Sequence, residues 1–175
     1  LKIRNLNQGE RIFGEIEGVV EGQWFKGRRE MMPTSFHRSW ARGIDGNGIT
    51  GASAIALSGG YEDDKDLGDE IIYTGAGGND PNTGHQIKDQ SWENAGNAAL
   101  VRSMNEGLPV RVIRGYKHNS PLSPSQGHAY AGLYSVIDAW LEQGISGFQI
   151  CRFKLVYSGD NTERGSVEEI EGQLD

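Results

Sequence analysis

The sequence predicts an α+β domain that is mainly β, with one or two short helices. Three observations lead to this class. The apolar residues fall into short runs that end at glycines or turn-forming residues, and only one segment has a helical pattern. In addition, 26 of the 175 residues are glycine, roughly twice the average usage. These glycines are scattered rather than repeated, which suits short strands joined by tight loops.

The expected strands are short apolar runs bounded by glycine or turn residues. They span residues 52–57, 71–74, 110–113, 133–137 and 148–157. In the last run, the alternation of apolar and polar residues changes phase between Ile150 and Phe153. We expect a β-bulge near Cys151 and Arg152 to cause this change.

One helix is expected between the second and third of these strands. Either Asn94 or Asn97 can cap its first turn. Its apolar side consists of residues 98–101 and Met104, and Gly107 ends it.

The length fits one domain, which we place at residues 1–157. Residues 158–175 are polar and contain six acidic residues and one basic residue, which is typical of a linker or acidic tail. The net charge of the chain is −7, and most of it therefore comes from this tail. The body of the domain is nearly neutral, so the overall charge does not exclude a nucleic-acid partner.

The composition argues against several classes of protein. Cys151 is the single cysteine, so no internal disulfide is expected, and no CxxC or HExxH motif supports a structural zinc site. We expect no metal and no cofactor. No apolar run is long enough for a membrane span, and residues 1–7 lack a signal-peptide pattern. The expected location is cytoplasmic and nucleoid-associated if the source is bacterial, and nuclear if it is eukaryotic.

Charge is segregated within the body of the domain. Residues 24–42 contain one acidic residue and five basic ones, namely Lys26, Arg28, Arg29, Arg38 and Arg42. Residues 62–70 are strongly acidic. Such runs are typical either of solvated loops or of a surface that binds phosphates, and the charge pattern alone leaves both interpretations open.

The most informative stretch runs from Ser58 to Asp80. It contains Tyr61 and Tyr73, twelve residues apart, with a cluster of carboxylates between them and glycine pairs on both sides. An extruded nucleobase needs an aromatic surface on each face and a polar group at its Watson–Crick edge. An aspartate accepts a hydrogen bond from the amino group of cytosine. Glycines let backbone N–H groups approach the ring closely.

Other interpretations of this stretch remain open. Both tyrosines could belong to the core or its rim, and the acidic run could be a solvated turn. Asp64, Asp66 and Asp69 are oxygen donors at close spacing and could bind a cation, although Gly68 does not stand where an EF-hand requires glycine.

Residues 58–69 (SGGYEDDKDLGD) together with residues 72–78 (IYTGAGG) resemble the signature of the SRA family (SET and RING associated, also called YDG), whose members read modified cytosine in DNA. Similar blocks occur at 13–19, 36–38, 43–44, 97–100, 109–114, 130–134, 146–148 and 152–153. The resemblance covers residues 13–157. It implies a twisted, partly closed β-barrel of the PUA-like type.

The resemblance also implies a pocket for an extruded 5-methylcytosine. Tyr61 and Tyr73 would stack on the two faces of the base, and Asp64 would accept a hydrogen bond from its amino group. The main chain of three further residues would line the rest of the polar edge, namely Ser58, Gly60 and Thr74. Whether the pocket also accepts 5-hydroxymethylcytosine depends on the space around C5.

Two loops of the family fill and flank the gap that the extruded base leaves. In the first, the position that enters the duplex matches Ala41, which is too small to fill the gap. We therefore expect Trp40 or Arg42 to act as the wedge, and Arg38 and Arg42 to grip phosphates. His37 is a further candidate for a phosphate contact. The alternative is that Trp40 only packs on the surface.

The second loop, residues 80–88, is shorter than in the mammalian members of the family and lacks their Asn-Lys-Arg finger. It therefore has less means to inspect the opposite strand, and fully modified or unsymmetrical sites become candidates beside hemimethylated ones. Within this loop, His85 and Lys88 are the candidate DNA contacts.

The resulting hypothesis is a DNA-binding module that flips out and recognises 5-methylcytosine in duplex DNA without performing chemistry on it. It would be the specificity domain of a modification-dependent restriction endonuclease, with an HNH nuclease elsewhere in the full-length protein and dimerisation through such missing parts left open. One alternative is a metal-dependent phosphodiesterase using Asp63, Asp64 and Asp66. Another is a protein-interaction module with a decayed pocket.

Overall fold

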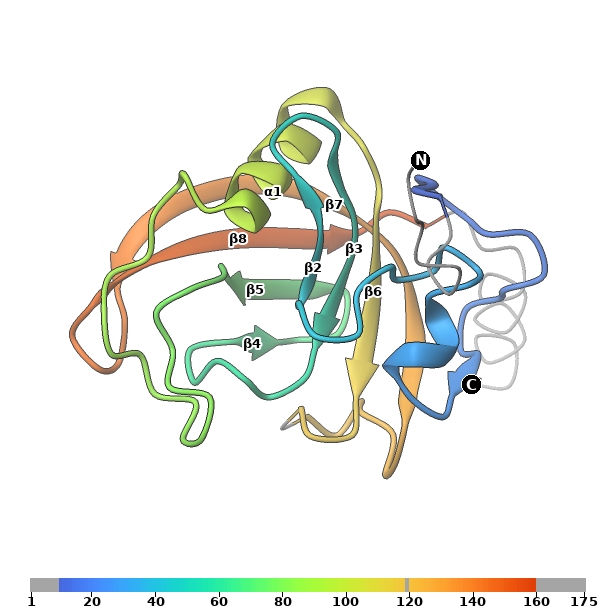
Figure 1. The fold of residues 1–175 in the computed structure, drawn as a ribbon, viewed down its shortest axis with the longest axis horizontal. Coiled ribbons are helices and arrows are strands. Elements are labelled where there is room, and N and C mark those ends of the chain that lie inside the picture. Colours follow the sequence, from blue (N-terminus) through green and yellow to red (C-terminus); the bar gives the residue numbers. More distant parts are fainter. Residues whose placement is uncertain (1–9, 119, 160–175) are drawn as a thin grey trace, which may run out of the picture.

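The computed structural model describes residues 10–118 and 120–159, so nearly all of the expected tail lies outside the described residues. The chain forms a strongly twisted sheet with one α-helix against it (Figure 1). The elements are β1 (Trp24–Phe25), the 3-10 helix η1 (Arg28–Met31), β2 (Ile44–Asn47), β3 (Gly51–Leu57), β4 (Lys65–Asp66), β5 (Glu70–Thr74), α1 (Ala95–Glu106), β6 (Val110–Gly115), β7 (His128–Gln143) and β8 (Gln149–Tyr157).

The eight strands belong to a single sheet in the order β2-β3-β6-β7-β8-β5-β4, and β1 pairs with β7. Among the described strands, β3 and β6 form the one parallel pair, and the other pairs are antiparallel. The prediction of a mainly β domain with one or two helices is confirmed. In the described residues no pairing joins β2 to β4, so the sheet is not closed, and the expected barrel is not confirmed.

The 16-residue strand β7 carries the sheet from one half of the molecule to the other. Its first part pairs with β6 and β1, and its second part pairs with β8. The register between β7 and β8 shifts at Ile137, which lies between the pairs Val136↔Leu155 and Asp138↔Lys154. This extra residue bends the strand locally, as a β-bulge does.

The prediction of a bulge near Cys151 and Arg152 is therefore wrong, because the bulge lies in β7 at Ile137. The pairing of β8 with β5 is regular through this region. The phase of the sequence pattern changes because Ile150, Cys151, Arg152 and Phe153 are all buried, Arg152 at 2% exposure. A strand that is covered on both faces does not alternate, whatever its geometry.

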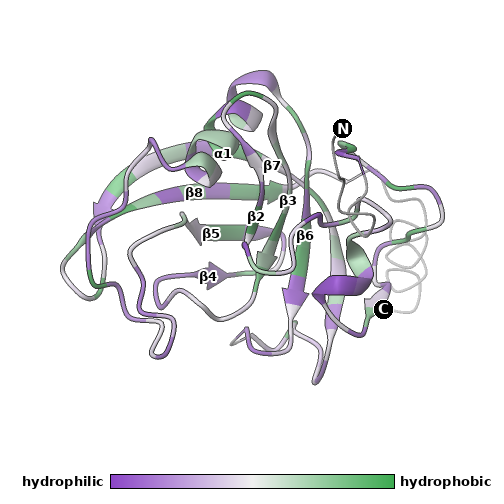
Figure 2. Ribbon diagram, viewed as in Figure 1, coloured by the Kyte–Doolittle hydropathy of each residue, from purple (hydrophilic) through white to green (hydrophobic). Residues whose placement is uncertain are grey.

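One core cluster lies between the sheet and α1, which packs against β2, β3 and β7. In a second cluster, Phe25, Met31 and Phe36 pack with residues of β3, β6 and β7. All seven residues of β3 are buried. Figure 2 shows hydrophobic residues along β3, whereas the edge strand β4 is hydrophilic.

The helix α1 begins after Asn94, one of the two cap candidates, whose side chain accepts hydrogen bonds from the N–H groups of Gly96 and Asn97. As predicted, it ends at Gly107, which adopts the left-handed conformation with φ 66°.

Among the described residues, no helix is long and apolar enough to cross a membrane.

Candidate nucleobase-binding site

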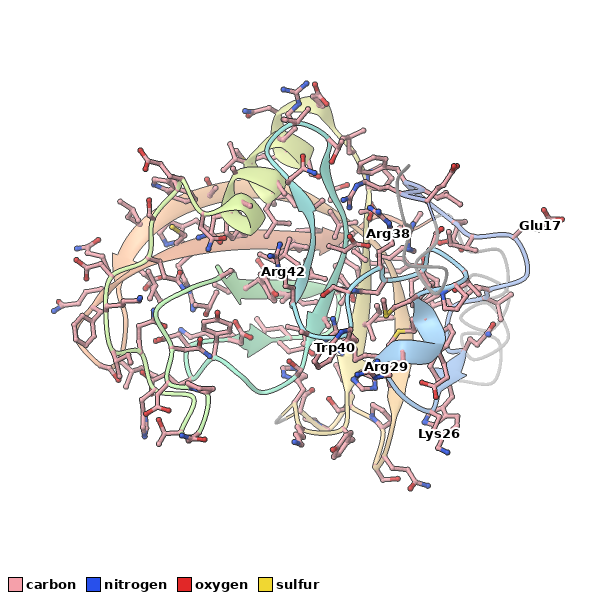
Figure 3. The ribbon with its side chains drawn as sticks, viewed as in Figure 1. Glu17, Lys26, Arg29, Arg38, Trp40 and Arg42 are labelled. Carbon is pink, nitrogen blue, oxygen red and sulfur yellow. The ribbon has the colours of Figure 1, made fainter. Side chains whose placement is uncertain are left out.

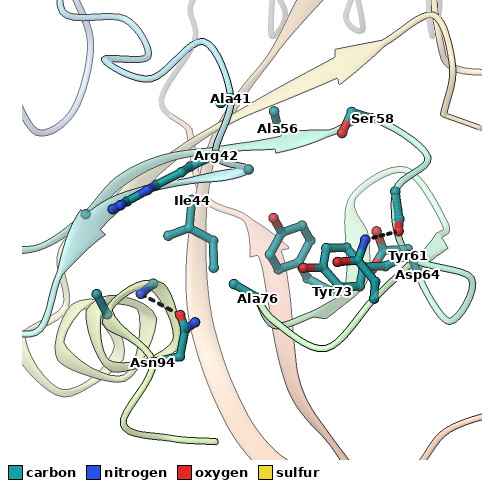
Figure 4. Close-up of a pocket in the computed structure, with 16 residues that line it drawn as sticks. Ala41, Arg42, Ile44, Ala56, Ser58, Tyr61, Asp64, Tyr73, Ala76 and Asn94 are labelled. Carbon is teal, nitrogen blue, oxygen red and sulfur yellow. Dashed lines mark hydrogen bonds between the residues drawn. The ribbon is translucent and has the colours of Figure 1, made fainter. Parts of the chain in front are cut away.

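A cavity of about 440 Å³ lies in the gap between the two ends of the open sheet. One wall comes from β2, β3 and the residues before β2, and includes Ala41, Gly43 and Ala56. The opposite wall comes from the segment around β4 and β5, and the start of α1 closes a third side (Figure 4). The cavity therefore occupies the place where a closed barrel would have its seam.

Both tyrosines that the sequence singled out line this cavity. Tyr73 lies on β5 and is 3% exposed. Tyr61 lies in the loop before β4, where its hydroxyl oxygen accepts a hydrogen bond from the N–H of Gly77 at 2.9 Å. Gly43 allows the wall to approach Tyr73, since a Cβ at this position would lie 2.9 Å from the hydroxyl of Tyr73. Ser58 and Gly60 also line the cavity, as expected.

Asp64 lines the same cavity and stands one residue before β4. Its Oδ1 accepts a hydrogen bond from the N–H of Thr74 at 2.7 Å. Burial raises the pKa of the Asp64 carboxyl to about 6, although hydrogen bonds from Thr74 and the charges of Arg152 and His118 oppose that rise. The two oxygens of an ionised carboxylate can accept about four hydrogen bonds, so the bonds from Thr74 leave acceptor capacity for a ligand.

Thr74 occupies a different place from the one we expected. Its residue is 1% exposed and does not contribute to the lining of the cavity. Because its N–H donates to Asp64, this group is not free to contact a base. Thr74 holds the carboxylate in position from behind.

The other carboxylates of the acidic run face separate partners. Oδ1 of Asp63 accepts from the N–H of Ile145 at 2.9 Å. Asp66 accepts two hydrogen bonds from Arg114, at 2.7 and 2.9 Å, and its Oδ2 also lies 2.9 Å from Nε2 of His118. Within residues 10–118 and 120–159, no group of three His, Cys, Asp or Glu side chains is arranged to hold a metal ion. The geometry therefore does not support the metal-dependent phosphodiesterase.

Asn97 supports the glycine-rich wall of the cavity, a role that sequence reasoning missed. Its Oδ1 accepts from the N–H of Ala76 at 2.7 Å, and its Nδ2 donates to the carbonyl of Ala76 at 3.1 Å. A Cβ on Gly75 would lie only 2.4 Å from Oδ1 of Asn97, so the close packing of this wall on α1 requires glycine. The sequence offered Asn97 only as an alternative helix cap.

The segment 39–42 reaches the cavity and is held from beneath by Arg28. Nη2 of Arg28 donates to the carbonyl of Ser39 at 2.7 Å and to the carbonyl of Arg42. Oγ of Ser39 accepts from the N–H groups of Ala41 and Arg42 at 3.2 and 2.9 Å. These bonds fix both ends of a tight turn. The sequence had placed Arg28 only within a basic stretch.

The side chains of this turn lie in two places. Ala41 and Arg42 line the cavity, and Arg42 extends away from the tyrosines (Figure 4). Trp40 is 54% exposed, and the guanidinium of Arg29 lies 4.6 Å from its ring centroid. Arg38 borders a neighbouring hollow with Trp40. Figure 3 shows these basic residues and Trp40 on the segment that leads into β2.

His37 does not lie where a phosphate contact requires. The residue is fully buried, and its Nε2 lies 3.0 Å from the carbonyl of Gly43. Burial and the nearby charge of Arg28 lower its pKa to about 4, so the ring is neutral near pH 7. Its role is to support the segment before β2 from within.

The loop of residues 80–88 is tied to the loop that carries Tyr61. Nδ1 of His85 lies 2.6 Å from Oε2 of Glu62, and Oε1 of Glu62 accepts a hydrogen bond from Ser146. These two bonds lower the pKa of the Glu62 carboxyl. Lys88 is exposed and, like His85, does not line the cavity.

The fold and the site together define a mainly β binding domain whose pocket offers two aromatic rings, one carboxylate oxygen and closely approaching backbone. The chain belongs to the SAD/SRA domain family, whose model matches residues 12–160. The resemblance noted in the sequence is thereby confirmed.

Solved structures of similar proteins point the same way. The modification-dependent TagI restriction endonuclease is 49% identical, with a TM-score of 0.82 over 86% of this chain and 54% of that chain. The SRA domain of SUVH5 in complex with fully methylated CG DNA is 38% identical, with a TM-score of 0.71 over 86% of this chain and 97% of that chain.

Two curated relatives are much longer proteins. A UHRF1-like protein of Cryptococcus neoformans is 42% identical over 154 residues, which cover 82% of this chain and 45% of the relative. The histone-lysine N-methyltransferase family member SUVH9 of Arabidopsis thaliana is 40% identical over 168 residues, which cover 92% of this chain and 25% of the relative. The chain thus spans less than half the length of either relative.

Proposed function

We propose that this domain binds duplex DNA and holds one extruded 5-methylcytosine in the cavity between the ends of the sheet. The observation that carries the proposal is the convergence of Tyr61, Asp64 and Tyr73 on a single cavity. The similar SRA domain of SUVH5 has been solved with fully methylated and with fully hydroxymethylated CG DNA, which supports both bases as ligands.

The geometry suits a cytosine ring. The two tyrosines supply aromatic surfaces, and stacking of this kind contributes about 1–3 kcal/mol per base. This is comparable with the few kcal/mol that unpairing and unstacking a base costs. Asp64 then accepts from the cytosine amino group, and backbone at Ser58 and Gly60 completes the polar edge.

We further propose that Arg42 fills the gap in the duplex. Ala41 and Arg42 stand at the cavity, whereas Trp40 is engaged with Arg29 beside it. Trp40 and Arg38 then contact the DNA backbone next to the gap. His85 and Lys88, on the short loop, would meet the opposite side of the duplex, without the long finger that would restrict binding to hemimethylated sites.

The domain recognises the base and does not alter it. By similarity to the TagI endonuclease, we propose that it is the specificity domain of a longer, modification-dependent nuclease in which an HNH module would supply cleavage. The domain would end near Tyr157 and be followed by an acidic linker. Its place of action is wherever genomic or invading DNA is found, which is the nucleoid in a bacterium and the nucleus in a eukaryote.

The experiment is a mobility-shift titration with otherwise identical duplexes that carry C, 5-methylcytosine or 5-hydroxymethylcytosine on one or both strands. We expect tighter binding to the modified duplexes. Asp64→Ala should abolish this preference because the acceptor is lost, whereas Glu106→Gln, on the exposed face of α1, should retain it. Thermal unfolding of both variants checks that the fold is intact. Equal affinity of the wild-type domain for all duplexes would contradict the proposal.

A further inference from the structure

A buried arginine stands behind the carboxylate of the cavity. Arg152 lies on β8 directly opposite Thr74 of β5 and is 2% exposed. Its Nη1 donates to Oγ1 of Thr74 at 2.9 Å and to the carbonyl of Asp63 at 2.6 Å. Its charge is balanced by Glu142, whose Oε1 lies 2.9 Å from Nε. One guanidinium nitrogen thus links the end of β5 to the loop that carries Asp64.

The direction of each hydrogen bond from Arg152 through Thr74 to Asp64 is fixed by the groups that take part. A guanidinium has only donors, so the hydroxyl of Thr74 must accept from Arg152. The proton of that hydroxyl is left for Asp64, with which the Thr74 side chain forms a hydrogen bond. Asp64 therefore receives two hydrogen bonds from Thr74, one from N–H and one from O–H. Both bonds favour the ionised carboxylate, which can only accept.

The burial of Asp64 works in the opposite direction. It raises the pKa of the carboxyl to about 6, so losing one donor would bring protonation close to neutral pH. The charged and titratable groups that face Asp64 come from its own loop, from β5, from β8 and from the loop after β6, and they are Tyr61, Tyr73, Arg152 and His118.

The protonation state of Asp64 decides whether the pocket rejects thymine. Thymine carries the same methyl group as 5-methylcytosine, but it presents the acceptor O4 where cytosine presents an amino donor. A carboxylate rejects O4 because no hydrogen stands between the two oxygens. A protonated carboxyl has an O–H that can donate to O4, so it no longer rejects thymine.

We propose that Arg152 is a positioning residue for base selectivity: through the hydroxyl of Thr74 it keeps Asp64 an obligatory acceptor, and the domain thereby distinguishes 5-methylcytosine from thymine. This inference rests on the proposed function. It identifies the methyl-bearing pyrimidine with an amino group, rather than the methyl group alone, as the feature that the pocket reads.

The test compares two duplexes that differ at one base, 5-methylcytosine opposite guanine and thymine opposite guanine, between pH 5.5 and pH 8.5. The mismatched thymine is easier to extrude, so the comparison favours thymine from the start. At pH 7.5 the wild-type domain should prefer 5-methylcytosine by about tenfold or more. The preference should fall only as the pH drops through about 6.

Thr74→Val and Arg152→Lys should shift this fall to higher pH, so that the preference at pH 7 drops at least threefold and returns at pH 8.5. Thr74→Ser, which restores a hydroxyl, should return the profile to lower pH. Thr74 lies at the end of a strand, where valine fits sterically. The valine and serine pair therefore decides the question even if Arg152→Lys fails to fold.

Different results would contradict the proposed function and the role of Arg152. If the wild-type domain does not distinguish 5-methylcytosine from cytosine in a third duplex, the proposed function is wrong. If it makes that distinction, but Thr74→Val keeps both the wild-type preference over thymine and its pH profile, the role of Arg152 is overturned.

Discussion

At the scale of single residues, we predict that Asp64 makes the proposed DNA binding depend on pH. Its pKa is raised to about 6, so the acceptor is ionised above this pH and is lost as the pH falls through it. If only the ionised form binds, the affinity for a 5-methylcytosine duplex at pH 5 should be about tenfold lower than at pH 7.5. Fluorescence anisotropy titrations across this range measure the effect.

The matched variant is Asp64→Asn, whose side chain has nearly the same shape and does not titrate. Its binding should be weaker than that of the wild-type domain at pH 7.5 and should lack the step near pH 6. A step of equal size in the variant would assign the pH dependence to another group.

We predict that Asp66 contributes to the stability of the fold rather than to base recognition. Arg114 and His118 hold its pKa well below the usual range although burial acts against them. A depressed pKa in the folded state gives stability that is present above the unfolded-state pKa, near 4, and is lost as the pH falls. Asp66→Asn leaves Arg114 without its buried counter-charge, which typically costs about 3–5 kcal/mol. Urea unfolding at pH 7 measures this loss, and a change below 1 kcal/mol would contradict it.

Some of the individual site residues could be predicted from the sequence, and others could not. Tyr61, Asp64 and Tyr73 lie within one short stretch, so residue types and spacing made them candidates, and the family resemblance then favoured them over the other interpretations. The roles of Thr74, Arg152 and Asn97 depend on pairings between distant segments, such as Thr74↔Arg152 across β5 and β8. His37 was misassigned because its neighbour Arg38 is basic, whereas burial decides what a histidine can contact.

At the scale of elements, the turn of residues 39–42 is positioned by η1. Because Arg28 ties the carbonyls at both ends of the turn, Arg28→Met should loosen it without disturbing the core. We expect the affinity for modified duplexes to fall about tenfold, or about 1.4 kcal/mol, because the turn loses the two bonds that hold its ends. Titrations with modified and unmodified duplexes measure the change.

Arg29→Met is the matched control for that variant. It removes a neighbouring charge of η1 that contacts Trp40 but holds no backbone of the turn. Its effect should be smaller and similar for both duplexes. If Arg28→Met lowers binding no more than Arg29→Met does, the bracing role of Arg28 is wrong.

The elements themselves were predictable where apolar runs are long enough to give a period. All five expected strands exist, and so does the helix with its Asn94 cap and Gly107 end. The short strands β1, β2 and β4 were missed because two to four residues give no periodic signal, and β2 contains a glycine as well. The bulge was misplaced because consecutive residues of β8 are buried, which interrupts the alternation of apolar and polar residues as a bulge would.

At the scale of the whole molecule, the proposed DNA contacts are cationic although the chain carries a net charge of −7. Binding should therefore weaken steeply with salt, since neutralising each phosphate releases counterions. Removing one phosphate contact, as in Lys88→Gln, should lower the slope of log K against log salt by about 1. Titrations at several salt concentrations measure it. A wild-type affinity that does not depend on salt would exclude this interface.

The open sheet connects the fold to the proposed activity. The cavity lies between β2 and β3 near one end of the sheet and β5 and the loop before β4 near the other, so the proposed base pocket lies where a continuous sheet would have closed. Charge patterns and composition could not reveal this seam, because it depends on the order of strands. The family resemblance gave the pocket residues, and the structure shows which elements bring them together.

The most direct measurement is a crystal structure of the domain with a duplex that contains a single 5-methylcytosine. We predict that this base lies outside the helix between Tyr61 and Tyr73, with its amino nitrogen at hydrogen-bonding distance, about 3 Å, from Asp64. A 5-methylcytosine that remains stacked and paired in the bound duplex, with the cavity facing away from the DNA, would contradict it.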